Sequence, residues 1–329
     1  MILPPTFVSE TSLVSLRKSG TLQILQLAPR GTVRASSYVV SGWPKGSDPV
    51  GIRPSTTKNL FVVLADTKGG AAISLLLVRS GRASIVQRVE THEWFASIEA
   101  GQAKDSFYMP QGWGEAGIFH VSQGRTIVWD RLPRSRRPLA DRTVLGNVAK
   151  ADPRPFWLSV FSMSDTTYFT GYELREGRAA PISGDRNPIL SITAIAAWRA
   201  GEEYAVLENG GRVFRFRKGS SRAEPTASRV QESILFAFAG CRRRPVALVA
   251  GENRAILLRR TGTFGWSKTT ACAIGRSDMN GSTAAIDDRG RWGVVVTGDG
   301  TAHVLRIEGN AKMRLVRELP EYASAYTFV

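Results

Sequence analysis

The feature that most constrains this chain is a repeat of strand-like segments. Units begin near residues 6, 51, 95, 156, 194, 234 and 284. Within a unit, runs of about four to eight residues rich in Val, Ile, Leu, Phe and Thr alternate with Gly, Asn, Asp and Ser, as β-strands and turns do. The 3.6-residue apolar spacing of a helix is hard to find over any long stretch, so we expect very little helix.

The clearest unit, Ala284 to Leu319, predicts four antiparallel strands. A polar turn at Asp287–Gly290 separates the first two strands, and a tight turn at Gly298–Gly300 separates the second from the third. Glycine-rich turns are strong hairpin signals, because glycine adopts positive φ without steric cost. Such a sheet cannot bury both faces alone and must stack against similar units.

The other units repeat this order, with a turn expected between their second and third strands. These turns are predicted at Lys18–Gly20, Lys68–Gly70, Gln123–Gly124, Arg175–Gly177, Asn209–Gly211 and Gly251–Asn253. A period of about 40–45 residues with four strands per unit is typical of a propeller blade. We therefore expect an all-β fold, a seven-bladed β-propeller with four-stranded antiparallel blades that spans residues 1–329 as a single domain. The alternative is a large β-sandwich or barrel built from hairpins.

Two segments resemble WD40 repeats. "IDDRGRWGVVVTGDGTAHVLRI", Ile286–Ile307, is similar to the turn–strand–turn–strand core of that family, and "TIVWD", Thr126–Asp130, is similar to the end of its third strand. The resemblance implies a WD40-like propeller in which Trp129 and Asp130 close a third strand and Asp299 orders a tight turn.

The chain also departs from the WD40 pattern. It contains no Gly-His dipeptide, and its three histidines are His92, His120 and His303. We therefore expect no blade to complete the family's His–Asp–Ser/Thr–Trp hydrogen-bond network.

Known catalytic and metal-binding motifs are absent from the sequence. There is no nucleophile elbow, phosphate-binding loop or His-Glu-x-x-His helix. Cys241 and Cys272 lack Cys-x-x-Cys spacing and are expected to be free thiols without disulfides. We expect no enzymatic activity, cofactor or metal.

The apolar pattern bears on where the protein works. No apolar run approaches the roughly 18 residues of a membrane span, and no secretory signal is visible. The expectation is an intracellular protein, of cytoplasm or nucleus, without membrane insertion.

The charge balance points to acidic partners. Lys and Arg number 44 against 28 Asp and Glu, a formal net charge of +16, which favours nucleic acid, an acidic protein surface or anionic lipid. In a WD40-like blade, the loops between strands one and two and between strands three and four emerge at one end. The other loops emerge at the opposite end, where Asp66, Glu208, Glu252 and Asp299 are expected.

Arginine-rich loops are assigned to the first end, and residues 131–155 are the longest insertion. Because the planar arginine fork pairs with carboxylate and phosphate, this basic end is the candidate binding site. Its predicted residues are Arg131, Arg134, Arg136, Arg137, Arg215, Arg217, Lys218, Arg242, Arg243, Arg244, Arg259 and Arg260, with Arg222, Arg289 and Arg291 at the same end.

Three functions remain open for this end. It could dock an acidic partner, which would make the chain a non-catalytic scaffold in a multi-protein assembly. It could contact RNA or DNA backbone without sequence specificity. It could also be a solvated face with no specific partner.

Overall fold

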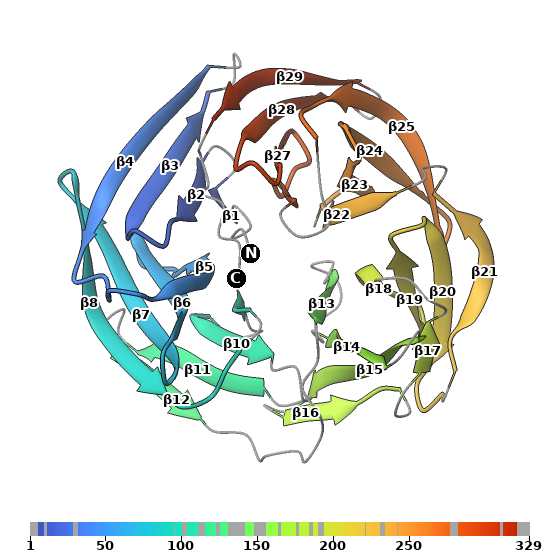
Figure 1. Ribbon diagram of the computed structural model, residues 1–329, viewed down its shortest axis with the longest axis horizontal. Helices are drawn as coiled ribbons and strands as arrows, with labels where there is room; N and C mark the ends of the chain where they lie inside the picture. Colours follow the sequence, from blue (N-terminus) through green and yellow to red (C-terminus); the bar gives the residue numbers. More distant parts are fainter. Residues whose placement is uncertain are drawn as a thin grey trace. The chain divides into compact units, whose positions relative to one another are not determined.

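A computed structural model describes residues 6–9, 12–28, 32–95, 97–100, 104–110, 116–122, 126–130, 142–147, 156–163, 166–175, 178–183, 187–189, 194–220, 222–230, 234–241, 243–276, 282–309 and 312–320. The chain forms two compact units. Leu3–Gln111 and Glu115–Arg136 make up the N-terminal unit, and Arg137–Val329 makes up the C-terminal unit together with Met1–Ile2 and Gly112–Gly114. The described residues form strands and turns and no helix (Figure 1), so none of their segments is a helix that could cross a bilayer.

The N-terminal unit contains three groups of antiparallel strands. The first is β1 (Thr6–Ser9), β2 (Ser12–Leu16), β3 (Thr21–Leu27) and β4 (Val33–Ser41). The second is β5 (Asp48–Pro54), β6 (Leu60–Thr67), β7 (Gly70–Arg79) and β8 (Arg82–Thr91). The third is β9 (Glu99–Ala100), β10 (Ser106–Pro110), β11 (Ala116–Ser122) and β12 (Thr126–Asp130). In each group every strand pairs with the next one along the chain.

The first two groups of the N-terminal unit are joined into one sheet of eight strands. Their last strands, β4 and β8, pair in parallel, with Val40 opposite Ala83 and Ser41 opposite Ser84. Parallel pairing is unusual here, because every other strand pair in this unit is antiparallel.

The C-terminal unit repeats the arrangement four times. Its first group is β13 (Arg142–Asn147), β14 (Phe156–Met163), β15 (Thr166–Arg175) and β16 (Arg178–Pro181), with β17 (Asn187–Ile189) paired to β15. The next is β18 (Ala194–Ala200), β19 (Glu203–Glu208), β20 (Arg212–Arg217) and β21 (Glu224–Arg229). The last two are β22 (Leu235–Gly240), β23 (Val246–Gly251), β24 (Arg254–Thr261) and β25 (Gly265–Ala273), then β26 (Thr283–Ile286), β27 (Trp292–Val296), β28 (Ala302–Glu308) and β29 (Lys312–Leu319).

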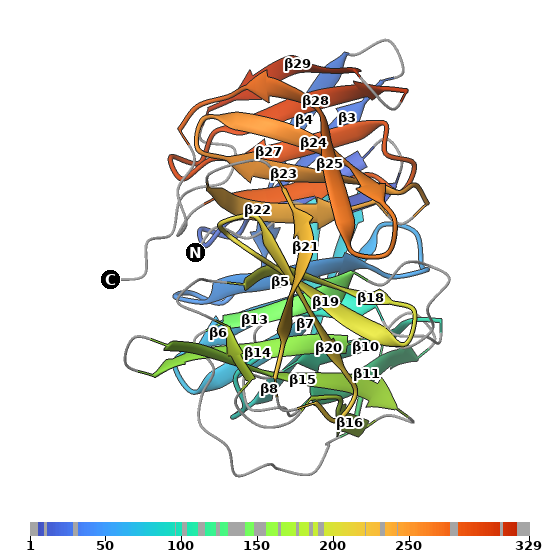
Figure 2. The same cartoon turned by 90° about the vertical axis from the view of Figure 1, so that its right-hand side faces the viewer.

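The hydrophobic core lies between successive groups of strands. In the C-terminal unit, Phe156 of β14 and Phe169 of β15 pack in one cluster with Val206 of β19 and Phe214 of β20. A similar cluster joins β18–β20 to β23 and β24, and another joins β22–β24 to β27–β29. Figure 2 shows the last two groups, orange and red, running alongside one another. The middle groups of strands in each unit thus bury both faces by stacking on their neighbours, as the repeat predicted.

The predicted position of the turns is correct in five units and wrong in two. Gln123 and Gly124 fall between β11 and β12, the third and fourth strands of their group. Arg175 likewise ends β15, the third strand of the next group, because β13 precedes β14. Trp129 and Asp130 therefore end a fourth strand, and the prediction that they close a third strand is wrong. Both signals do mark hairpins, but these hairpins join third and fourth strands and not second and third strands.

The predicted insertion at residues 131–155 contains regular structure. Residues 142–147 form β13, which pairs antiparallel with β14 and continues in parallel with β18. The remaining parts, 131–141 and 148–155, lie outside the described residues.

Candidate functional site

One edge of the C-terminal unit contains the loops between first and second strands and the loops between third and fourth strands. We call it the basic edge. Antiparallel order places these loops at the same end of each sheet. Hydrogen bonds also connect the loops of neighbouring sheets. Arg260 Nη2 donates to the carbonyl oxygens of Arg199, at 3.4 Å, and Thr263, at 3.0 Å. Arg244 Nη2 donates to the carbonyl of Gly309 at 2.9 Å.

Arg131, Arg134, Arg136 and Arg137 lie outside the described residues. The strands that flank them are β12, the fourth of its group, and β13, the first of the next. The prediction that Trp129 and Asp130 end a third strand is wrong, and the assignment of these arginines to the binding site stays a prediction. Arg242 also lies outside the described residues.

Arg215 and Arg217 lie on β20, and both face carboxylates of neighbouring strands. Arg217 Nε is 2.7 Å from Glu203 Oε1 on β19, and Arg215 Nη2 is 3.2 Å from Glu224 Oε2 on β21. Arg215 Nη1 also lies 3.8 Å from Glu203 Oε2. Two arginines and two glutamates thus form a charge-balanced group, although 77% of the Arg217 side chain is exposed.

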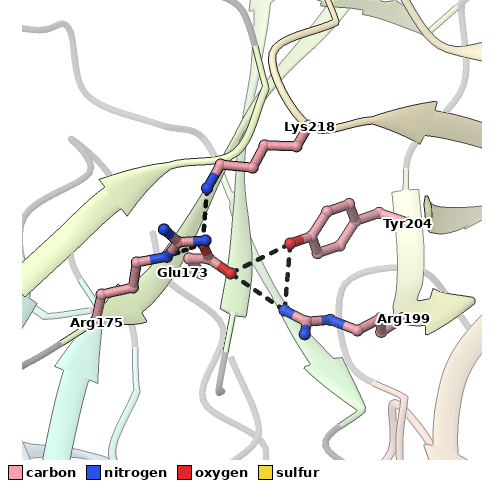
Figure 3. A network of polar contacts seen from close by, with 5 residues as sticks. All are labelled: Glu173, Arg175, Arg199, Tyr204 and Lys218. Atoms are coloured by element: carbon pink, nitrogen blue, oxygen red, sulfur yellow. Dashed lines mark hydrogen bonds and ion pairs between the residues drawn. The ribbon is translucent and has the colours of Figure 1, made fainter. Parts of the chain in front are cut away.

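Lys218, next along the chain, belongs to a different group that is centred on Glu173 (Figure 3). The Glu173 side chain is fully buried, and its Oε2 accepts hydrogen bonds from Arg199 Nη2 at 3.1 Å and from the Tyr204 hydroxyl at 3.2 Å. Its Oε1 faces Lys218 Nζ at 3.5 Å and also pairs with Arg175 Nε. We call these five residues the Glu173 cluster; they come from β15, β18, β19 and the turn after β20.

The charge state of Glu173 follows from its partners. Burial raises the pKa of this carboxyl, but the charges of Arg175 and Lys218 and the hydrogen bonds from Arg175 and Tyr204 outweigh burial and bring the pKa below its ordinary value. Glu173 is therefore ionised at neutral pH. Three cations surround one carboxylate, so the Glu173 cluster carries a surplus of two positive charges.

Backbone carbonyls hold Arg244 and Arg260 in place. Arg244 Nη1 donates to the carbonyls of Arg289 and Gly290, at 3.4 and 3.3 Å, in addition to its bond with Gly309. Burial lowers the pKa of Arg260, yet an arginine remains protonated at neutral pH. The acceptors carry only partial charges, so both guanidinium groups add positive charge to the basic edge.

Arg222, Arg243 and Arg259 are exposed at the same edge. The Arg243 backbone amide donates to the carbonyl of Asp288 at 3.2 Å, which ties its loop to the next sheet. The structure therefore brings Arg215, Arg217, Lys218, Arg243, Arg244, Arg259 and Arg260 to one edge of one unit.

Sequence reasoning missed the centre of the Glu173 cluster. Glu173, Arg175, Arg199 and Tyr204 were not among the predicted site residues. A glutamate next to buried Tyr172 in a strand was the available signal, because an ionised side chain is seldom buried unless it is paired.

Two of the acidic residues predicted for the opposite loops, Glu208 and Asp299, have local partners. Glu208 is fully buried and pairs with Arg212, and Asp299 Oδ1 accepts hydrogen bonds from Thr297 Oγ1 at 2.6 Å and from the Thr301 amide at 3.0 Å. Glu252 is exposed. Asp299 thus orders its turn, as the resemblance to WD40 repeats implied.

The last sheet contains a short histidine network that the sequence did not predict. His303 Nε2 lies 3.3 Å from Thr297 Oγ1, and His303 Nδ1 lies 3.2 Å from Glu318 Oε1. With the Thr297–Asp299 bond, these contacts link a His, a Thr and an Asp. Burial lowers the pKa of His303 more than Glu318 and Asp299 raise it, so the imidazole is neutral at neutral pH.

The described residues offer little for metal chemistry. They contain no group of three His, Cys, Asp or Glu side chains that could hold a metal ion. Cys241 and Cys272 are both free thiols.

Comparisons with known proteins show the fold. No family model and no curated protein matches the chain. The WD40 β-propeller domain of Doa1 is similar at a TM-score of 0.57 and 11% identity over 92% of each chain. Sqt1 of Saccharomyces cerevisiae is similar at a TM-score of 0.55 and 8% identity over 98% of this chain and 84% of that chain.

A putative 6-phosphogluconolactonase from Bacteroides uniformis is similar at a TM-score of 0.65 and 11% identity, over 95% of this chain and 97% of that chain. Identities this low carry the fold and no activity. The chain therefore has an all-β, WD40-like propeller fold with four-stranded antiparallel sheets. The seven-blade count and the single-domain organisation stay predictions.

Proposed function

We propose that this chain is a non-catalytic scaffold or interaction subunit, and that its basic edge docks an acidic partner protein. The way in which Arg244 and Arg260 are held carries the proposal. Carbonyls of other loops fix both guanidinium groups in place without cancelling their charge. Cations fixed before binding lose little conformational freedom when a partner arrives.

Exposed arginines complete the docking surface. Arg217, Arg222, Arg243 and Arg259 are all exposed along the same edge. Each guanidinium can present two parallel N–H donors to a carboxylate. An edge of this kind fits a protein surface with spaced Asp and Glu side chains.

The pattern of charge favours protein over nucleic acid. Glu203 and Glu224 lie between the arginines of the edge, and they would repel a continuous phosphate backbone. Trp198 and Trp266 are buried, so these tryptophans do not offer the exposed rings on which single-stranded bases stack. Nucleic-acid binding remains the alternative that the experiment must exclude.

The described side chains of the basic edge support a non-catalytic role. Its one described cysteine, Cys241, is partly buried, and burial raises the pKa of its thiol. A protonated thiol is a poor nucleophile. Residues 194–276 also contain no histidine to act as a base.

The proposal is tested with an acidic peptide and an RNA. A fluorescent polyglutamate of about ten residues and a single-stranded RNA of about 20 nucleotides are titrated against the purified chain at two salt concentrations. We expect the peptide to bind. Absence of peptide binding at low salt would contradict the proposal, and tighter, steeply salt-dependent RNA binding would replace the protein partner with a nucleic acid.

Charge-reversal variants locate the surface. Arg222→Glu, Arg243→Glu and Arg259→Glu together should weaken peptide binding at least about tenfold. The matched control carries Arg34→Glu, Arg79→Glu and Arg82→Glu, three exposed arginines of the N-terminal unit. Equal losses in the two triple variants would show that net charge, and not the basic edge, determines binding.

A further inference from the structure

The Glu173 cluster differs from its neighbour on the basic edge. Around Glu203, two arginines meet two glutamates, so the charges balance. Around Glu173, two arginines and a lysine meet one carboxylate. The surplus positive charge is concentrated at one place, because all three cations contact the same buried carboxylate.

The cluster has an inner and an outer layer. Arg199, with 13% of its side chain exposed, and the buried Tyr204 hold Glu173 Oε2 from inside. Arg175 and Lys218, with 43% and 48% of their side chains exposed, hold Oε1 from outside. The two outer cations are therefore fixed at one end and open to solvent at the other.

The outer layer, Arg175 and Lys218, has N–H donors beyond those that bind Glu173. Arg175 uses Nε for Glu173, and its Nη1 and Nη2 have no partner among the described residues. Lys218 Nζ contacts Glu173 at 3.5 Å, a long bond that leaves donor capacity for another acceptor. Because both groups bind the same oxygen, their remaining donors lie close together above the buried carboxylate.

We propose that Arg175 and Lys218 form an anion site that binds one carboxylate side chain of the partner's acidic surface. This site rests on the proposed function and names its anchoring point. Glu173 is the positioning residue: it cancels one of three charges, so that the cations stay together when the site is empty. A carboxylate that enters neutralises the surplus and accepts the Arg175 fork together with the lysine ammonium.

The test removes the outer cations. Arg175→Gln with Lys218→Gln should weaken polyglutamate binding by about tenfold or more. The comparison variant, Arg217→Gln with Arg259→Gln, removes the same charge from two other arginines of the docking surface and should lose less affinity than Arg175→Gln with Lys218→Gln does. Thermal unfolding of each variant confirms that it is folded.

The outcomes separate the two proposals. If the wild type binds the peptide and both double variants lose the same affinity, this site is wrong while the basic edge stands. If the wild type does not bind, the proposed function fails. Glu173→Gln keeps an acceptor oxygen for the cations and removes the negative charge, so it should tighten binding, and unchanged or weaker binding by the folded variant would overturn the site. If Glu173→Gln does not fold, exposed Lys218→Glu replaces it and should abolish binding, whereas retained binding overturns the site.

Competition identifies the chemistry of the anion. Free glutamate should displace the peptide from the wild type and should lose this effect in the Arg175→Gln and Lys218→Gln double variant. Displacement by inorganic phosphate at concentrations where glutamate has no effect would assign the site to a phosphate group and overturn the carboxylate.

Discussion

Asp48 and Asp66 lie directly opposite each other on the antiparallel strands β5 and β6. Lys18 Nζ donates to Asp48 Oδ2 at 2.8 Å, so the lysine reaches one member of the pair. Burial, and secondarily the charge of Asp48, raises the pKa of Asp66 to about 6. The N-terminal unit thus contains an aspartate that is ionised at neutral pH although the folded state favours its protonated form.

Removing this ionisable group should stabilise the protein at neutral pH. Between the ordinary aspartate pKa near 4 and the folded value of about 6, the folded state binds more protons than the unfolded state, so stability falls as pH rises. Asp66→Asn should raise the free energy of unfolding at about pH 7.5 by up to roughly 2–3 kcal/mol and change it little at about pH 4.5. Urea unfolding at both pH values measures this. The exposed Glu90→Gln is the control, and an Asp66→Asn profile parallel to wild type would refute the prediction.

The Glu173 cluster should contribute much more to stability than an exposed ion pair. Glu173→Ala removes the buried partner of Arg199 and should cost roughly 2–4 kcal/mol of unfolding free energy. Glu224→Ala removes a carboxylate that is 65% exposed and should cost less than about 1 kcal/mol. The pKa of Glu173 is lowered, so its contribution is present at neutral pH and is lost as acid protonates the folded state. Equal costs in urea unfolding at neutral pH would count against the cluster.

Two adjacent arginines provide a second matched pair. Arg244→Ala removes donors to three backbone carbonyls and should cost about 1–2 kcal/mol, because the part-buried carbonyl of Gly290 loses its donor. Arg243→Ala keeps the backbone bond to Asp288 and removes an exposed side chain, so it should cost less unfolding free energy than Arg244→Ala does. Chemical denaturation compares them, and a larger loss for Arg243→Ala would contradict this account.

The turn between β6 and β7 distinguishes two neighbouring glycines. Gly70 has φ of 142°, and a Cβ there would lie 2.1 Å from the carbonyl oxygen of Thr91, whereas a Cβ on Gly69 meets nothing within 4 Å. Gly70→Ala should therefore cost about 2 kcal/mol or more, while Gly69→Ala should stay within about 1 kcal/mol of wild type. Thermal unfolding midpoints test the order, which a more stable Gly70→Ala variant would reverse.

Much of the fold was predictable, because alternating strands and glycine turns are local signals. Gly298–Gly300 and Lys68–Gly70 mark the expected second-to-third turns. Residues 164 and 165, which separate β14 from β15, are Ser and Asp and give a weaker signal than the later glycine at position 177. A hairpin signal shows that a turn joins two strands, but it does not show which two of the four strands in a unit they are. The prediction therefore shifted the strand numbering by one in two units.

The sign of the charge at the candidate site could be predicted from the sequence, but the side-chain contacts within the site could not. Counting arginines along the sequence predicted a basic edge, because charge is a property of the sequence, and the role of this edge in binding stays a prediction. The contact between Glu173 and Arg199 joins residues from two groups of strands that β13 links into one sheet, and its formation depends on how the two groups are arranged. Arg134 and its neighbours lie outside the described residues, so their assignment to the site stays a prediction.

The parallel pairing of β4 with β8 affects how the N-terminal unit comes apart. In repeat architectures each unit has its own stability and a coupling to the next unit, and here the parallel pairing of β4 with β8, with Val40 opposite Ala83 and Ser41 opposite Ser84, adds to that coupling. Opening of either outer strand breaks bonds of both groups. The two groups should therefore behave as one cooperative foldon, whose amide protons in β4 and β8 exchange with solvent at a common rate.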